Sequence, residues 1–189
     1  MRRFLIPLIA LFAAAPVAAQ QTQAFRSEAG YTVQLPAAWR PLPDAVVEAL
    51  QQAGAQTGEG VTLEAGFRIT DASFLLISGF DVGQTITLEQ FVEEVTVATA
   101  QAQMQEGVEL MRKDARVDAP IWDAENRILW ARTQAPSTGQ RAARFSWSAS
   151  MLHPDGRTVV VFAVSAVTGA DEARIRADLL QIFRSLRVD

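Results

Sequence analysis

Residues 142–166 read AARFSWSASMLHPDGRTVVVFAVSA, and they predict a β-hairpin at the centre of the fold. Two arms, Ala142–Leu152 and Thr158–Ala166, flank the turn His153–Arg157. Proline presets φ for the first turn position, aspartate favours the next, and glycine accepts the positive φ that closes a hairpin. Because the turn residues and the apolar arms agree, the two strands should pair in an antiparallel sheet.

The two arms differ in the spacing of their apolar residues. The first arm alternates apolar with polar side chains, so one of its faces should be buried. The second arm is apolar on both faces, as expected of a central strand that is covered on each side. If five or six of its side chains are buried at about 1.5–3 kcal/mol each, this arm contributes on the order of 10 kcal/mol. The buried residues expected in the first arm are Phe145, Trp147, Ala149 and Met151.

The N-terminal segment predicts export. Arg2 and Arg3 precede an apolar run over residues 4–15, and small residues follow up to Ala19. This order is typical of a signal peptide that is cleaved after Ala19. An uncleaved anchor is the alternative, but the run is shorter than the roughly 20 residues that span a bilayer. We therefore expect a signal peptide over residues 1–19, a single domain over residues 20–189, and a periplasmic or secreted protein.

Composition narrows the possible partners. The chain has 17 basic and 21 acidic residues, a net charge of −4, and no cysteine. An acidic chain is a poor candidate for binding nucleic acid or an anionic membrane surface. The lack of cysteine excludes disulfides, thiol chemistry, thiolate metal sites and a lipid anchor on cysteine. We expect no cofactor, no nucleic-acid partner and no stable membrane insertion after cleavage, and the oligomeric state stays open.

The other apolar patterns predict strands, a long helix, more strands and a terminal helix. Tight turns join most of the strands, so the sheet should be mostly antiparallel, and helices segregated from strands are typical of an α+β fold. The long helix should begin at Thr87 with a capping box to Gln90, while Asp44 and Asp171 should cap the other two helices. The expected strands are 24–26, 31–35, 61–70, 74–80, 115–122 and 127–134, and the expected helices are 45–52, 87–105 and from 171 onward.

Several of these segments resemble the Mog1/PsbP-like (PsbP/DcrB-like) family of exported proteins. Tyr31–Pro36, followed by Trp39, resembles the family's aromatic strand that ends in Leu-Pro with a tryptophan soon after. Thr87–Phe91 resembles the start of its main helix, and Ile182–Leu186 resembles its C-terminal close. The resemblance covers nearly the whole mature chain by pattern. It implies an antiparallel sheet sandwiched between helices (α/β/α) and a binding or assembly module without catalytic residues.

One group of residues invites a catalytic interpretation. His153 is the sole histidine, and Ser148, Ser150 and Asp155 lie near it in the sequence. Residues this close on one hairpin cannot easily surround a substrate carbonyl, and no nucleophile-elbow motif is present. We interpret His153 as a turn residue and predict no catalytic residue.

Two turns carry oxygen ligands or charge without a convincing site. Asp123, Glu125 and Asn126 could bind calcium, but a calcium loop needs more ligands and a spaced glycine. A solvated turn is the simpler interpretation, and no metal site is predicted. Glu93 and Glu94 are adjacent on a predicted helix, so they do not face each other and indicate a solvent-exposed face.

One aromatic residue suggests a binding surface. Trp39 follows Leu-Pro and could rim a groove with Pro41 and Pro43, since tryptophan contributes strongly at interfaces. The alternative is that Trp39 packs in the core, as expected of Trp130 and Trp147.

Three functions are compatible with these observations. The first is a non-enzymatic exported envelope protein that binds another protein or assists assembly. The second is a carrier that binds a small apolar ligand between the helix layer and the sheet. The third is a hydrolase, which the absence of a convincing catalytic group disfavours.

Overall fold

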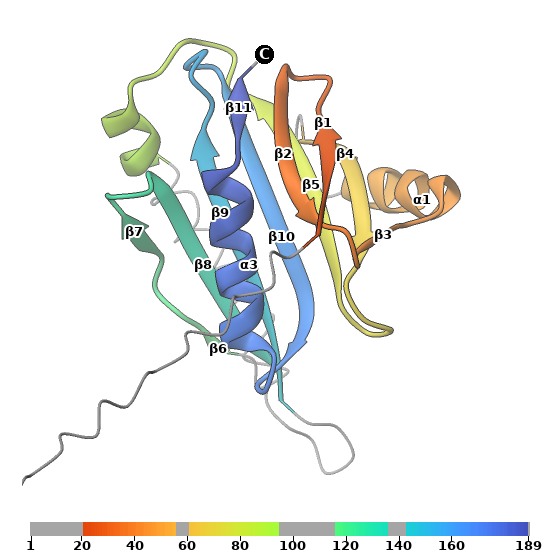
Figure 1. The fold of residues 1–189 in the computed structure, drawn as a ribbon. Coiled ribbons are helices and arrows are strands. Elements are labelled where there is room, and N and C mark those ends of the chain that lie inside the picture. The colour runs from red at the N-terminus through yellow and green to blue at the C-terminus, as the bar shows by residue number, and fades with distance from the viewer. Residues whose placement is uncertain (1–20, 56–60, 95–115, 136–142, 189) are drawn as a thin grey trace, which may run out of the picture.

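The computed structural model describes residues 21–55, 61–94, 116–135 and 143–188. The predicted signal peptide, residues 1–19, lies outside these ranges. Strands and helices follow one another in the order strands, helix, strands, helix (residues 88–94), strands, helix and a final short strand (Figure 1). The elements are β1 (Thr22–Arg26), β2 (Tyr31–Pro36), β3 (Arg40–Pro41), α1 (Asp44–Ala55), β4 (Val61–Arg68), β5 (Phe74–Asp81), β6 (Arg116–Val117), β7 (Ile121–Asp123), β8 (Ile128–Ala135), β9 (Arg144–Leu152), β10 (Thr158–Thr168), α3 (Glu172–Arg184) and β11 (Arg187–Val188).

An eight-stranded sheet forms the centre of the molecule. Its order is β3-β4-β5-β10-β9-β8-β6, with β7 also paired to β8, and all of these described pairs are antiparallel. β10 lies between β5 and β9. The β9–β10 hairpin pairs Val159 with Leu152, and Gly156 closes its turn with a φ of 70°. The predicted hairpin and the central place of its second arm are confirmed.

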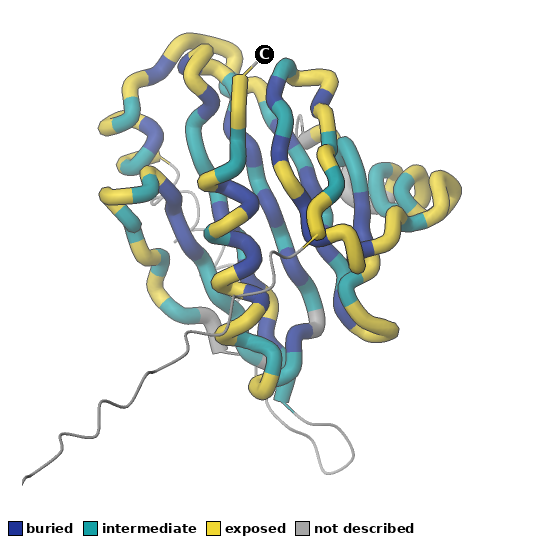
Figure 2. Tube along the Cα trace, in the orientation of Figure 1, coloured by how far each residue is buried: buried dark blue, intermediate teal, exposed yellow. Residues whose placement is uncertain are grey.

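β10 packs against apolar clusters on both of its faces. Val160, Phe162 and Val164 are at most 1% exposed and belong to the cluster that contains the apolar stripe of α3. Val159 is also fully buried, but it packs with Phe91 in a separate cluster. Because neighbouring residues of a strand point to opposite faces, the two clusters lie on opposite sides of the sheet. Figure 2 shows buried and half-buried residues alternating along the central strands.

A three-stranded sheet, in the order β1-β2-β11, shares one face of the large sheet with α3 (Figure 1). The buried stripe of α3 consists of Ile175, Leu179, Ile182 and Phe183, as its sequence pattern predicts. The rings of Phe183 and Phe162 meet edge to face, with 4.7 Å between their centres. This helix therefore covers the middle of the sheet and leaves the β4–β5 side to the small sheet.

Glu172 attaches the start of α3 to the large sheet. Its carboxylate accepts hydrogen bonds from Nε of Arg132 and, at 2.9 Å, from the indole N–H of Trp147. Arg132 also reaches the carboxylate of Asp118, and its guanidinium lies 4.3 Å from the centre of the Phe145 ring. The hydrogen bond from Arg132 keeps the pKa of Glu172 below its usual value, although partial burial opposes this effect. An acidic residue in the first turn also interacts favourably with the helix dipole.

The opposite face is covered, within the described ranges, by residues 86–94, of which 88–94 are helical. Thr87 and Gln90 form the predicted capping box. The N–H of Gln90 donates to Oγ1 of Thr87 at 3.2 Å, and the N–H of Thr87 donates to Oε1 of Gln90 at 2.8 Å. Phe91 is fully buried and its ring centre lies 6.4 Å from that of Trp122. The remainder of this predicted helix, residues 95–105, lies outside the described ranges.

Three local details differ from the sequence prediction. The spacing of Val46, Val47 and Leu50 predicts one buried face of α1, but Val46 is 42% exposed. Asp171 occupies the N-cap position of α3 but makes no side-chain cap bond, because its carboxylate instead accepts hydrogen bonds from Thr168 and Arg174. β11 was not predicted, since two residues carry no periodic signal, and it closes the small sheet by pairing with β2.

Candidate binding cleft

A cleft of about 620 Å³ separates the small sheet from one end of the large sheet. This volume lies within the roughly 300–1,000 Å³ of typical ligand-binding pockets. The small sheet and its turn contribute one wall, and β4, β5 and the start of β10 contribute the other. The lining residues are Phe25, Arg26, Glu28, Ala29, Thr62, Leu63, Glu64, Gly79, Phe80, Asp81 and Thr158.

Glu64 enters this cleft because β4 contains a bulge. Opposite β5, Leu63 pairs with Ser78 but Ala65 pairs with Ile77, so Glu64 is one extra residue in the strand. A bulge changes the direction of a side chain and is common beside functional sites. The backbone N–H of Leu63 donates a hydrogen bond to Oε1 of Gln51 in α1. Strict alternation predicts Glu64 on the face opposite Ala65, and this prediction is wrong because the bulge turns its carboxylate toward the small sheet.

Two hydroxyl groups of the small sheet hold the Glu64 carboxylate in place. The hydroxyl of Ser27 donates to Oε2, and the hydroxyl of Tyr31 donates to the same oxygen at 3.2 Å. Ser27 is itself fixed, because its Oγ accepts the N–H of Ala29 at 2.9 Å. Burial, and then the negative charge of Glu64, raises the pKa of Tyr31 above its usual value. Tyr31 therefore stays a neutral hydrogen-bond donor to the carboxylate.

Gly79 of β5 keeps space beside the second carboxylate oxygen. A Cβ atom at this position would lie 2.8 Å from Oε1 of Glu64, closer than side-chain carbons approach oxygen. Within the described ranges, the hydrogen bonds to Glu64 reach Oε2. Oε1 is therefore the oxygen of this carboxylate that a ligand in the cleft can contact.

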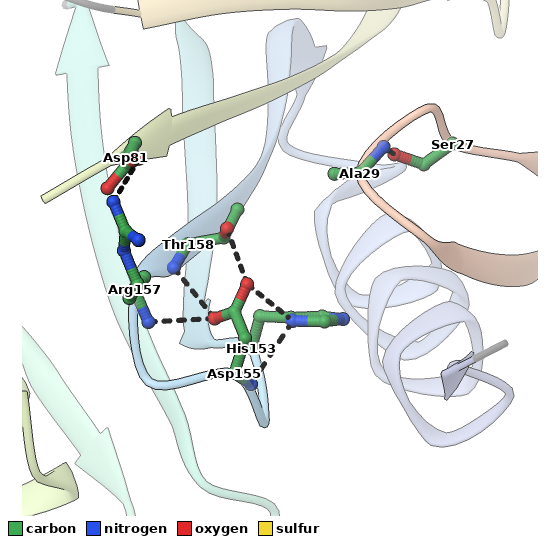
Figure 3. Close-up of polar contacts among 7 residues, drawn as sticks. All are labelled: Ser27, Ala29, Asp81, His153, Asp155, Arg157 and Thr158. Carbon is green, nitrogen blue, oxygen red and sulfur yellow. Dashed lines mark hydrogen bonds and ion pairs between the residues drawn. The ribbon is translucent and has the colours of Figure 1, made fainter. Parts of the chain in front are cut away.

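The turn between β9 and β10 meets the cleft at Thr158. Figure 3 shows the hydrogen bonds by which Asp155 holds this turn together. Oδ1 of Asp155 accepts the N–H groups of Arg157 at 2.7 Å and Thr158 at 2.9 Å, and Oδ2 accepts the Thr158 hydroxyl at 2.8 Å. Burial alone would raise the pKa of Asp155, but these donors outweigh it and lower the pKa to about 2. Arg157 extends the cluster to Asp81 through a 3.0 Å ion pair.

His153 is a buried residue rather than an exposed part of the turn. It is 5% exposed, its Nδ1 lies 3.1 Å from the Asp155 carboxylate, and its ring lies 6.2 Å from that of Tyr31. Within the described ranges its Nε2 has no hydrogen-bond partner. Ser148 and Ser150 alternate with the core residues of β9 and share the face of Leu152, whereas His153 contacts the other face. The structure therefore does not bring the two serines to the histidine.

The other candidate residues occupy structural positions. Both carboxylate oxygens of Asp123 accept hydrogen bonds from Asn126, and Oδ1 of Asn126 accepts Nε of Arg184 at 3.0 Å. These oxygens stabilise the β7–β8 turn, and the hydrogen bond from the Asn126 side chain lowers the pKa of Asp123. In the described part of the chain, no group of acidic, histidine or cysteine residues has metal-binding geometry. Glu93 and Glu94 are exposed, as predicted.

The three residues proposed from sequence as a binding surface do not lie in this cleft. Trp39 is 3% exposed and packs in the main core, so its indole offers almost no surface to a ligand. Pro41 and Pro43 are exposed on either side of Leu42. A binding role for this segment stays a prediction that only the two prolines could support. Trp130 and Trp147 are core residues, as predicted, and their rings meet edge to face at 6.0 Å.

The architecture matches solved structures, whereas the sequence alone has no match among protein-family models or curated proteins. The solution structure of cyanobacterial PsbP (CyanoP) from Synechocystis sp. PCC 6803 superimposes with a TM-score of 0.54 at 12% identity, over 95% of this chain and 99% of that one. The chain has a Mog1/PsbP-like fold. The Ran-binding protein Mog1p of Saccharomyces cerevisiae matches at a TM-score of 0.49 and 8% identity, over 89% of this chain and 96% of Mog1p.

The Mog1/PsbP-like fold confirms the predicted architecture, a mostly antiparallel α+β arrangement, and no more than the fold follows at such low identity. No helix within the described ranges is long and apolar enough to cross a membrane. Sequence reasoning missed Glu64, Ser27 and Gly79 as site residues. The sequence carries one signal for this site, the acidic Glu64 inside a strand of alternating apolar residues. Such a residue is common on solvent-exposed faces, so it does not point to a site.

Proposed function

We propose that the chain is a non-catalytic binding module of the cell envelope, exported by its signal peptide, which recognises another protein. The observation that carries this proposal is the cleft with a fixed carboxylate on its wall. A concave surface with a small number of precisely oriented polar groups is the usual form of a recognition site. The neutral hydroxyls of Ser27 and Tyr31 hold Glu64 in one orientation before any ligand arrives.

The positions of the candidate catalytic residues support binding over hydrolysis. A serine hydrolase needs the nucleophile within hydrogen-bond distance of a base. Neither ring nitrogen of His153 is hydrogen-bonded to a serine in the described part of the chain. The residues that line the cleft instead carry three carboxylates, two threonine hydroxyls and two phenylalanine rings. A screen of esterase and peptidase substrates should therefore give no turnover above background.

The structure gives less support to a carrier of a small apolar ligand between helix and sheet. One cavity at this boundary, between α3 and β2, has a volume of about 160 Å³. This volume is below the roughly 300 Å³ at which pockets begin to hold drug-sized ligands. Its lining includes Gln34, Asp178 and Gln181, which do not suit an apolar molecule.

Site-specific photo-crosslinking in intact cells tests the proposed function. A photo-reactive residue replaces Thr62, which is exposed and lines the cleft, or Ile121, which is 51% exposed on β7 at the far side of the sheet. We expect the Thr62 variant to capture an envelope protein that the Ile121 variant does not capture. Identical products from both variants, or none from either, would overturn the proposal.

A further inference from the structure

β1 has an open edge in the described structure. It is the end strand of the order β1-β2-β11, and no described strand pairs with its other side. In an antiparallel pair, hydrogen-bonded residues alternate with residues whose main-chain groups point away from the partner. The 2.8 Å bonds from Ser27 N–H to Tyr31 O and from Ala37 N–H to Gln21 O establish this alternation. The main-chain N–H and C=O of Ala24 therefore point away from β2.

This open edge leads into the cleft. Phe25, near the end of β1, lines the cleft together with Leu63 and Gly79 of the large sheet. A segment that paired with β1 would turn one face toward the large sheet, because side chains alternate along a strand. Its main-chain groups would pair with β1 while every second side chain entered the cleft. This combination of main-chain pairing and side-chain pockets is the geometry of strand addition.

Carboxylates dominate the charge of the cleft. Glu28, Glu64 and Asp81 line it, and Arg26 is the sole basic side chain among its described lining residues. Asp81 is paired with Arg157 at the rim, so Glu28 and Glu64 supply the negative charge that a ligand meets. Oε1 of Glu64 lies beside Gly79, while the two hydroxyl groups of the small sheet donate to Oε2. A lysine or arginine side chain forms strong charge-assisted hydrogen bonds with a carboxylate of this kind. The cleft therefore complements a basic side chain.

We infer that the partner contributes an extended segment that adds a fourth strand to the small sheet beside β1. A lysine or arginine of this segment binds Oε1 of Glu64. The inference rests on the proposed function and specifies the element of the partner that is recognised. Main-chain pairing supplies affinity for any extended segment, and the basic side chain selects among segments. A second copy of this chain is the competing occupant, because it also carries a β1 edge.

Binding of synthetic peptides to the purified protein tests the inference. The probe is a fluorescent eight-residue peptide of alternating threonine and valine in which one central valine is replaced by lysine. Fluorescence anisotropy should show saturable binding below about 1 mM, and a glutamate in place of the lysine should weaken binding at least about tenfold. Two N-methylated forms block the N–H groups on one edge of the peptide or on the other. One form should lose binding and the other should keep it.

Substitutions in the protein test the same contacts as the changes in the peptide. Glu64→Gln keeps the shape of the side chain but removes its charge. It should weaken binding of the lysine peptide about tenfold and should not weaken binding of the glutamate peptide. Ala24→Pro removes the outward N–H, a change that edge strands tolerate, and should weaken both peptides. Ala24→Ser keeps the N–H and is the matched control. Thermal unfolding of each variant shows whether a loss of binding comes from loss of the fold.

The outcomes separate this inference from the proposed function. Binding that is insensitive to N-methylation and to Ala24→Pro overturns strand addition. Absence of saturable peptide binding overturns it as well, and crosslinking at Thr62 would still support a binding module. A protein that sedimentation shows to be a dimer, and that Ala24→Pro converts to a monomer, assigns the edge to a second copy and overturns the inference.

Discussion

Gly156 closes the β9–β10 turn in a left-handed backbone conformation. Its φ is 70°, and a Cβ atom there would lie 2.8 Å from Cγ2 of Thr85 and 3.2 Å from the carbonyl oxygen of Ile86. A left-handed conformation alone costs a non-glycine residue about 1–2 kcal/mol. We therefore expect Gly156→Ala to lower the free energy of unfolding by more than about 2 kcal/mol, measured by urea denaturation.

Gly83 provides the matched control for this variant. Its φ is 78°, and a Cβ atom there would meet nothing within 4 Å. Gly83→Ala should therefore show the conformational cost alone, about 1 kcal/mol. Equal losses of stability in the two variants would show that the contacts with Thr85 and Ile86 carry no cost.

Asp155 makes stability depend on pH in the acid range. Its pKa is about 2 in the folded protein, against 3.8 for an unperturbed aspartate. Because folding lowers the pKa, the ionised carboxylate stabilises the folded state above about pH 4, and this contribution is lost as the pH falls from about 4 toward 2. The side chain is 39% exposed, so solvent screening reduces the contribution to about 1 kcal/mol.

Urea denaturation at about pH 6 and about pH 2.5 measures this contribution. The side chain introduced by Asp155→Asn does not titrate. From about pH 6 to about pH 2.5, the free energy of unfolding of this variant should therefore fall by about 1 kcal/mol less than that of the natural protein. The same pH dependence in both proteins would mean that other carboxylates account for the whole effect.

Two neighbouring valines of β10, Val160 and Val161, lie on opposite faces of the sheet and are buried to different degrees. Val160 is fully buried in the apolar cluster that contains the stripe of α3, whereas Val161 is half-buried on the other face. Truncation of a buried side chain loses its transfer free energy and leaves a cavity. We expect Val160→Ala to destabilise the protein by about 1 kcal/mol more than Val161→Ala, as measured by urea denaturation. Equal effects would show that the two side chains lose the same packing on truncation.

At the level of elements, local patterns predict the structure well and long-range pairing does not follow from them. The β9–β10 hairpin follows from its own turn and alternation, and the capping box of Thr87 and Gln90 follows from residues three positions apart. The bulge at Glu64 depends instead on which residues of β5 lie opposite β4. The burial of Trp39 depends on how the small sheet folds over the large one. Neither arrangement has a periodic signal in the sequence.

At the level of the whole molecule, the prediction of export concerns the first nineteen residues, which lie outside the described ranges. Mass spectrometry of the protein recovered from the envelope fraction should show a chain that begins at Gln20. Arg2→Glu together with Arg3→Glu removes the positive charge that precedes the apolar run, and should leave precursor in the cytoplasm. A full-length chain in the envelope fraction would support the uncleaved anchor instead.

The overall fold could be predicted because β10 is apolar on both faces, and such a strand requires a covering layer on each side of the sheet. The cleft could not, because it lies between elements that are distant in the sequence. Phe25 and Glu28 come from the N-terminal strands, Thr158 comes from the β9–β10 hairpin, and each looks like an ordinary strand or turn residue in the sequence. Spacing within one segment cannot show that such residues share a wall.

The pairing of β11 with β2 has a consequence for the order of assembly during synthesis. Arg187 pairs with Thr32, so one strand of the small sheet leaves the ribosome before the large sheet is made and its neighbour leaves afterwards. The small sheet cannot close until both strands are free. The three-stranded order β1-β2-β11 is therefore completed only when the C-terminal residues have been synthesised, so the first residues of the domain wait for the last ones.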